Sequence, residues 1–137
     1  MIRVLVAALF LLGAHFAGTY LVPSPAGKAS FYWPWAQDPG GWAVLGERAA
    51  LVPAQWQVLQ PVAALAAFAY LAAFLALFGW LVPPAWAQPL AVAGSVASIA
   101  LFAAHLGPLA ILPTLLDLIV LWGVFGMGWK PESLAGA

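Results

Sequence analysis

The stretch PLAILPTLLDLIVLWGVFGMGW, residues 108–129, decides the fold class of this chain. Apart from Thr114 and Asp117, it consists of apolar residues and glycine from end to end. At 1.5 Å per residue, a helix of this length crosses the roughly 30 Å of bilayer hydrocarbon. An acid within such a segment is costly, and ionisable residues inside membranes are typically functional. Asp117 is therefore the first candidate site residue.

The composition of the whole chain supports a membrane protein. Of its 137 residues, 66% are hydrophobic and 6% are charged, and the mean hydropathy is +1.02. Soluble domains carry roughly 25% charged residues, so lipid must cover much of this surface. The net charge is zero and the four basic residues are scattered, which argues against nucleic acid as a partner. The chain has no cysteine, which excludes disulfides, thiolate chemistry and cysteine-ligated metals.

The predicted fold is an all-α integral membrane protein, a four-transmembrane-helix up-down bundle forming a single membrane domain over residues 1–137. Four apolar segments bounded by proline or glycine supply the helices, at about residues 2–22, 53–82, 90–106 and 108–129. The first segment begins like a signal peptide but lacks a small-residue cleavage site, so we interpret it as an uncleaved membrane helix. The tail, residues 130–137, is expected to be disordered.

The long connection between the first two helices, residues 23–52, is rich in aromatic side chains. It contains FYWPW at residues 31–35 and Trp42, which is typical of a belt at the membrane interface. Asp38 followed by Pro39 resembles a helix start, so a short amphipathic helix extending to about Ala50 is an alternative to irregular loop. The connection either anchors the protein in the headgroups or forms a lid over the bundle.

Two helix faces stand out by their small and polar residues. In the first segment Leu11, His15, Gly18 and Thr19 share a face, which we expect to point towards protein. In the third segment small and polar residues recur at steps of three and four, a pattern suited to close helix packing: Ala91, Ser95, Ser98, Phe102 and His105. The serines there are expected mainly to hydrogen-bond neighbouring backbone.

The rise per residue places His15, His105, Asp117 and Tyr70 in one layer of the membrane, and Thr114 shares a face with Asp117. Four chemistries fit this polar cluster. The first is a structural hydrogen bond between Asp117 and a histidine, and the second is a proton relay through Asp117. The third is ligation of a haem by His15 and His105, or of a chlorophyll-type pigment by one of them. The fourth is a non-haem iron site of both histidines and Asp117.

The function that this pattern favours is a small accessory or structural subunit of a larger membrane complex, with lipid and other membrane subunits or copies of itself as partners. An energy-transducing complex is suggested only by His15, His105 and Asp117. One alternative is a membrane electron carrier or enzyme holding haem, pigment or iron. Another is a small oligomeric transporter with Asp117 as its proton site. No nucleotide-binding, zinc-protease or serine-hydrolase motif is present.

The predicted location is the prokaryotic cytoplasmic membrane. Four spans place both ends of the chain on one side, together with Arg3 and Lys130, whereas Lys28 and Arg48 lie on the other. The amino-terminal charge and the closeness of Arg3 to its helix favour both termini in the cytoplasm.

Overall fold

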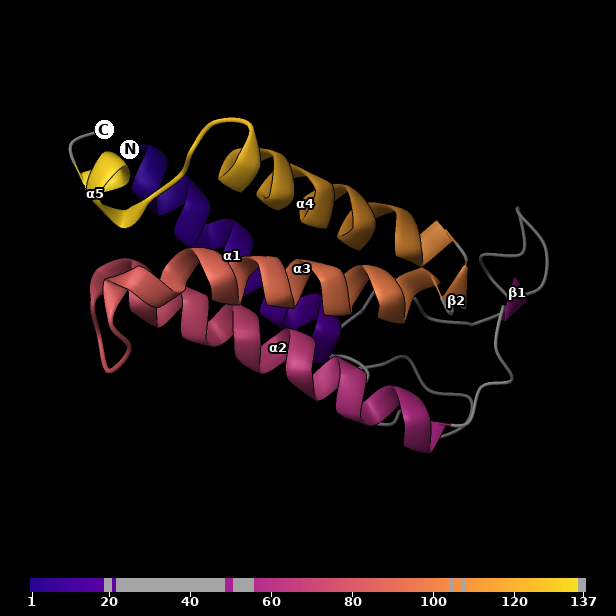
Figure 1. Ribbon diagram of the computed structural model, residues 1–137. Coiled ribbons are helices and arrows are strands. Elements are labelled where there is room, and N and C mark those ends of the chain that lie inside the picture. The colour runs from indigo at the N-terminus through magenta and orange to yellow at the C-terminus, as the bar shows by residue number, and fades with distance from the viewer. Residues whose placement is uncertain (19–20, 22–48, 51–55, 104, 107, 136–137) are drawn as a thin grey trace.

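The computed structural model describes residues 1–18, 21, 49–50, 56–103, 105–106 and 108–135. Within this part the regular structure is helical, apart from two strands of two residues each. Four longer helices lie alongside one another and alternate in direction (Figure 1). They are α1 (Ile2–Gly18), α2 (Trp56–Phe78), α3 (Ala87–Ala103) and α4 (Pro108–Phe125). Both ends of the chain lie at the same end of this bundle (Figure 1).

The helices pack mainly against their neighbours in sequence. Helix α2 lies between α1 and α3 and contacts both extensively, and α3 in turn packs against α4. Helix α1 touches α3 and α4 over shorter stretches, which closes the four helices around a common interior. Helix α4 therefore keeps a broad outer face that no other described element covers.

Small residues allow the helices to approach closely. The buried side of α2 is mostly alanine: Ala63, Ala66, Ala69, Ala73 and Ala76. The face predicted for α3 is buried as expected, with Ala91, Ser95, Ser98 and Phe102 all at most 4% exposed. Close approach of backbones across small side chains is the usual packing mode of helices in lipid.

Left-handed residues end α2 earlier than the sequence predicts. The helix stops at Phe78 rather than near Val82, because Gly79 adopts φ 69° and Leu81 adopts φ 59°. The Trp80 amide then donates to the Leu75 carbonyl at 2.9 Å and satisfies one of the last carbonyls of the helix. The chain continues into a short 3-10 turn, η2 (Pro84–Trp86), and α3 starts directly after it at Ala87, three residues before the predicted boundary.

Helix α4 also ends earlier than predicted, at Phe125 rather than Trp129. The amides of Gly126 and Met127 both donate to the Trp122 carbonyl, at 2.7 and 3.1 Å, and Gly128 adopts φ 64°. The Gly126 bond is the last with the helical i→i−4 spacing, whereas the Met127 bond spans five residues and ends the helix in a turn. Of the first predicted span, residues 2–22, the helix α1 covers Ile2–Gly18, and residues 19–20 and 22 lie outside the described part.

Over residues 130–135, its described part, the tail folds against the bundle, contrary to the prediction of disorder. Residues Pro131–Ala135 form a short helix, α5, in which Leu134 is 5% exposed and joins the hydrophobic core. The Gln88 side chain donates to the Trp129 carbonyl at 2.8 Å, which ties the segment before α5 to the start of α3. The chain thus folds back over the end of the bundle that carries its termini (Figure 1).

Most of the predicted interfacial connection, residues 23–52, lies outside the described residues. Its described part is β1 (Ala49–Ala50), which pairs antiparallel with β2 (His105–Leu106). The predicted interfacial helix is therefore wrong at its last two residues, where the backbone is extended. This pairing lies at the end of the bundle opposite the termini (Figure 1).

Two helical stretches are long enough and apolar enough to cross a membrane, Gln60–Phe78 and Pro84–Ala103. The described part of the chain adds two shorter apolar helices, Ile2–Gly18 and Ala110–Phe125. At 1.5 Å per residue, α1 and α4 are each about 26 Å long, a few ångströms less than the hydrocarbon thickness.

Candidate functional site

Tyr70 of α2 lies at the centre of the bundle and is fully buried. Its ring fills a slot between two glycines on neighbouring helices. A Cβ atom added at Gly13 of α1 would lie 2.6 Å from the ring, and one added at Gly94 of α3 would lie 3.0 Å from it. The Phe10 ring, with its centroid 6.2 Å away, completes the wall on the α1 side. Only residues without a side chain allow α1 and α3 to come this close to the phenol.

The Tyr70 hydroxyl connects three helices. It makes one hydrogen bond with the Ser95 hydroxyl of α3, at 2.8 Å, and a second with Oδ1 of Asp117 on α4. Ser95 Oγ also donates to the Ala91 carbonyl one turn earlier in α3, at 2.9 Å. The predicted bond from a serine of α3 to the neighbouring backbone is therefore present at Ser95. It is the last of three linked, buried hydrogen bonds that run from Asp117 through Tyr70 and Ser95 to the Ala91 carbonyl.

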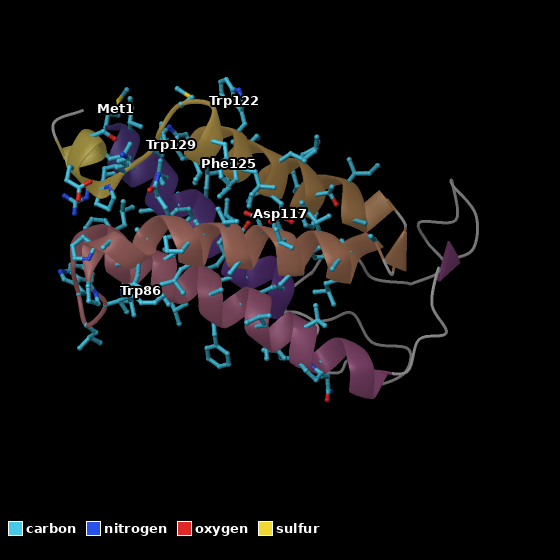
Figure 2. All side chains as sticks on the ribbon, viewed as in Figure 1. Met1, Trp86, Asp117, Trp122, Phe125 and Trp129 are labelled. Carbon is cyan, nitrogen blue, oxygen red and sulfur yellow. The ribbon has the colours of Figure 1, made fainter. Side chains whose placement is uncertain are left out.

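Asp117 is fully buried and points from α4 towards α3 (Figure 2). Its second oxygen, Oδ2, has no hydrogen-bond partner among the described residues, and neither does the Ser98 hydroxyl. Ser98 lies one turn beyond Ser95, is 1% exposed, and is close enough to the Asp117 carboxyl to interact with it. Buried polar atoms are nearly always paired, so these two neighbouring unpaired atoms mark the open end of the chain.

The structure separates His15 from this site. Gly13 faces Tyr70, and a residue two positions later in a helix lies about 200° around the axis. His15 is accordingly exposed on the outer face of α1, beside the Phe16 ring at a centroid distance of 6.0 Å. The predicted inward face of α1 is wrong at Leu11 and His15, which are exposed, whereas Gly18 is half-buried and Thr19 lies outside the described residues. The buried face of α1 is formed instead by Val6, Ala7, Phe10, Gly13, Phe16 and Ala17.

The remaining predicted residues lie at the margin. Thr114 is half-buried one turn before Asp117 and does not belong to the hydrogen-bonded chain seen in the described part. The backbone of His105 lies in β2, and its side chain falls outside what the structure describes. Among the described side chains the partner of Asp117 is thus a tyrosine and not His15, and the hydrogen bond between Asp117 and His105 stays a prediction.

The cofactor and metal hypotheses gain no support from this geometry. No three His, Asp or Glu side chains in the described ranges are grouped so that they could hold a metal ion. An iron site shared by His15 and Asp117 requires one side chain on the outside of α1 and the other in the bundle interior. A haem or pigment ligated by His15 would lie on the outer surface of the bundle.

A second polar contact joins α1 to α2, at the end of the bundle where the termini lie. Arg3 of α1 donates from Nη2 to the Leu77 carbonyl at 2.5 Å, and its guanidinium carbon lies 4.7 Å from the centre of the Phe78 ring. A cation on the last carbonyls of a helix complements the helix dipole, and a cation over an aromatic face adds to this. Arg3 therefore fastens the start of α1 to the end of α2.

Sequence reasoning identified Asp117 and Tyr70 but missed the residues that position them. Gly13 and Gly94 were the available signal, since glycine inside a helical segment costs stability and often marks a close packing contact. Ser95 was recognised as a packing residue but not as a partner of Tyr70.

The site is a filled interior that links helices and can hold a proton. A cavity of about 10 Å³, room for about one water molecule, lies nearer the termini, between Phe10, Ala91 and the returning segment with Trp129 and Leu134.

Comparison of the chain with family models, with curated proteins and with solved structures found no match.

Proposed function

We propose that this chain crosses the bilayer four times and acts as a structural subunit of a larger membrane complex, with its outer helix faces as its working surface. The observation that carries the proposal is the uncovered face of α4. Seven large apolar side chains, each at least 47% exposed, follow one side of that helix: Ile111, Leu112, Leu115, Leu118, Ile119, Trp122 and Phe125. Figure 2 shows Trp122 pointing away from the bundle.

The exposed faces of the other helices support a surrounding apolar phase. The two longest apolar stretches are only 39% and 44% buried, whereas a core helix of a soluble protein is mostly buried. Their outward side chains include Leu65, Phe68 and Leu71 of α2. Exposed apolar side chains in this number need lipid or protein to cover them. Four spans also agree with both termini at one end of the bundle (Figure 1).

The filled interior argues for a role exerted from outside the bundle. A channel or carrier needs a passage beside its charged residue, but Asp117 is enclosed by Tyr70, Ser95 and Ser98. The ring of Tyr70 in turn occupies the slot between Gly13 and Gly94. Partners would therefore meet this protein at its surface, and α4 offers the least covered one.

Native mass spectrometry of the protein, extracted together with its surrounding lipid, tests this proposal. We expect a defined assembly that contains other membrane chains or further copies of this one. The double variant Trp122→Ala/Phe125→Ala on α4 should lose the assembly. The matched variant Leu65→Ala/Phe68→Ala, on the exposed side of α2, should keep it. A chain that runs as a monomer after gentle extraction would exclude the subunit role.

A proton-handling role is the second candidate, and the unpaired Oδ2 of Asp117 beside the unpaired Ser98 hydroxyl favours it. Under this hypothesis Asp117 titrates during proton-linked transport or energy transduction. Reconstituted vesicles with a pH-sensitive dye distinguish the two roles. Proton flux that disappears in Asp117→Asn while assembly persists supports the second candidate, and absence of flux in the native protein removes it.

The proposed location is the prokaryotic cytoplasmic membrane, with both termini on the cytoplasmic side. The absence of cysteine makes this easy to test, because one introduced thiol is the only labelling site in the chain. Ser133→Cys lies in the exposed part of α5. It should react with a membrane-impermeant maleimide only after the cells are opened. Labelling in intact cells would place the termini outside.

A further inference from the structure

We infer that Asp117 is a proton-binding site, held as a neutral carboxylic acid whose O–H donates to the Tyr70 oxygen. The hydrogen bonds then run in one direction, from Asp117 to Tyr70, from Tyr70 to Ser95 and from Ser95 to the Ala91 carbonyl. This inference goes beyond the proposed structural role and does not depend on which partner, if any, the chain binds.

Counting protons along the chain gives the first argument. Three oxygen–oxygen contacts follow one another: Asp117 with Tyr70, Tyr70 with Ser95 at 2.8 Å, and Ser95 with the Ala91 carbonyl at 2.9 Å. Each contact needs one proton, and each hydroxyl supplies one. The carbonyl at one end only accepts, so Ser95 must donate to it, and Tyr70 must donate to Ser95. The third proton has to come from Asp117.

If Asp117 is ionised, the series of three hydrogen bonds lacks one proton. A carboxylate only accepts hydrogen bonds, so the hydroxyls of Tyr70 and Ser95 would have to serve three contacts with two protons. One pair of oxygens would then face each other through lone pairs, or one proton would be shared between two acceptors. The neutral acid satisfies all three contacts at once.

The absence of a countercharge among the described side chains, which do not include that of His105, gives the second argument. Among the described residues that pack around Asp117, the only titratable group facing it is the Tyr70 phenol of α2. Helix α3 has no titratable residue, and α4 has none besides Asp117. Helix α1 contributes Arg3, which binds the Leu77 carbonyl, and His15, which lies on the outer face. An unpaired charge buried in an apolar interior is very costly, and binding a proton removes that cost.

Ser98 fits the same assignment. When Asp117 carries its proton on Oδ1, Oδ2 is a carbonyl oxygen and can accept a hydrogen bond. The Ser98 hydroxyl is buried beside it and has no partner in the described part of the chain. Rotation of this hydroxyl towards Oδ2 adds one hydrogen bond to the series, so that it runs from Ser98 through the carboxylic acid to Tyr70.

Infrared spectroscopy of the full chain in lipid tests this inference, with carbon-13 in the side-chain carboxyls of aspartate. A carboxylic acid shows a C=O stretching band that a carboxylate lacks. The chain has two aspartates, Asp38 and Asp117. We expect an isotope-shifted acid band at neutral pH in the native protein. The band should persist in Asp38→Asn and disappear in Asp117→Asn.

The control variant decides the result even if Asp117→Asn fails to fold. In Asp38→Asn every labelled aspartate carboxyl belongs to Asp117, so an acid band at neutral pH assigns the proton. Carboxylate bands alone in that variant would overturn the inference. The spectrum is read on the chain without partners, so it is independent of the mass-spectrometric test of the subunit role, and either can fail alone.

Discussion

Gly13 of α1 lies directly against the ring of Tyr70 of α2, so close that a Cβ atom on Gly13 would sit 2.6 Å from a ring carbon. Real Cβ atoms essentially never come this near another heavy atom. The ring is held in place, because Gly94 of α3 also lies against it and its hydroxyl is bonded to Ser95 and Asp117. One missing side chain on α1 therefore sets how near that helix approaches the polar site.

Gly13→Ala should lower the free energy of unfolding by about 1–3 kcal/mol, the usual cost of overpacking a filled interior. Gly18→Ala is the matched control in the same helix, since an added Cβ there meets no atom of the described residues within 4 Å. The control should be neutral or slightly stabilising because alanine favours helix over glycine. Equilibrium unfolding in mixed micelles measures both, and equal effects of the two variants would contradict the slot described for Tyr70.

Tyr70→Phe should cost about 1–3 kcal/mol of unfolding free energy, because it removes the hydrogen bond of the buried Asp117 Oδ1 and leaves the Ser95 hydroxyl with the Ala91 carbonyl alone. Ser95→Ala removes a neighbouring member of the same chain. In a double-mutant cycle the two changes should be non-additive by at least about 0.5 kcal/mol, as is usual for residues in one hydrogen-bond network. Additive effects would mean that the 2.8 Å contact between the two hydroxyls carries no coupling energy.

Asp117→Asn should keep the free energy of unfolding within about 1 kcal/mol of the native value, a typical net value of one hydrogen bond. The amide NH₂ can donate to Tyr70 as the neutral acid does, and the amide oxygen remains an acceptor. Asp117→Leu is the comparison, since it removes both functions at similar volume and leaves the Tyr70 oxygen short of a donor. Both are measured by unfolding in mixed micelles, and an equal loss in the two variants would show that the carboxyl acts as a charge.

Gly123→Ala should release the returning segment that carries α5. An added Cβ at Gly123 would lie 2.3 Å from the Trp129 ring, so the indole has to move away from α4. The bond from the Trp129 amide to the Gly123 carbonyl, now 3.0 Å, would lengthen with it. Hydrogen exchange at residues 129–135 should become faster in this variant and stay unchanged in Gly18→Ala. Unchanged exchange at these residues in both would show that the segment is held by other contacts.

Arg3→Gln should loosen the end of α2. The guanidinium bond to the Leu77 carbonyl is charge-assisted, and such bonds contribute about 1.5–3 kcal/mol when buried and less when part-exposed, as here. Hydrogen exchange should rise at the amides of Gly79 and Trp80, which close the last turn of the helix. Glu132→Gln, an exposed change at the same end of the bundle, should leave that exchange unaffected.

The positions of the helices could be predicted from hydropathy, but their ends could not. Apolar residues continue through Trp80, Leu81 and Val82, so composition gives no sign that α2 stops at Phe78. The stop depends on left-handed backbone at Gly79 and at Leu81, and a leucine there has no sequence signature. The tail was expected to be disordered from its position in the chain, although burial of Leu134 against the core orders it.

The candidate site was found in part for a similar reason. A lone acid in an apolar segment is visible in any sequence, so Asp117 stood out. Its partner depends on the rotation of each helix, which packing decides. The polar residue His15 was given the inward face of α1, but Gly13 fits the ring of Tyr70, and close packing outweighs the polarity of one imidazole. On α3 the small residues and the polar ones share a face, and there the prediction was confirmed for Ala91 and Ser95.

The bond between Tyr70 and Asp117 also orders events during synthesis. In the proposed four-span arrangement, α4 is the last of the four helices to leave the ribosome, so α1, α2 and α3 are in the membrane while the Tyr70 hydroxyl still lacks its acid. Asp117 would then enter lipid with an insertion cost of about 2.5–3.5 kcal/mol, which is relieved only when it reaches that hydroxyl. Under this proposal, a molecule whose fourth helix has not docked differs from the folded one by a carboxyl group without a hydrogen-bond partner in the bilayer.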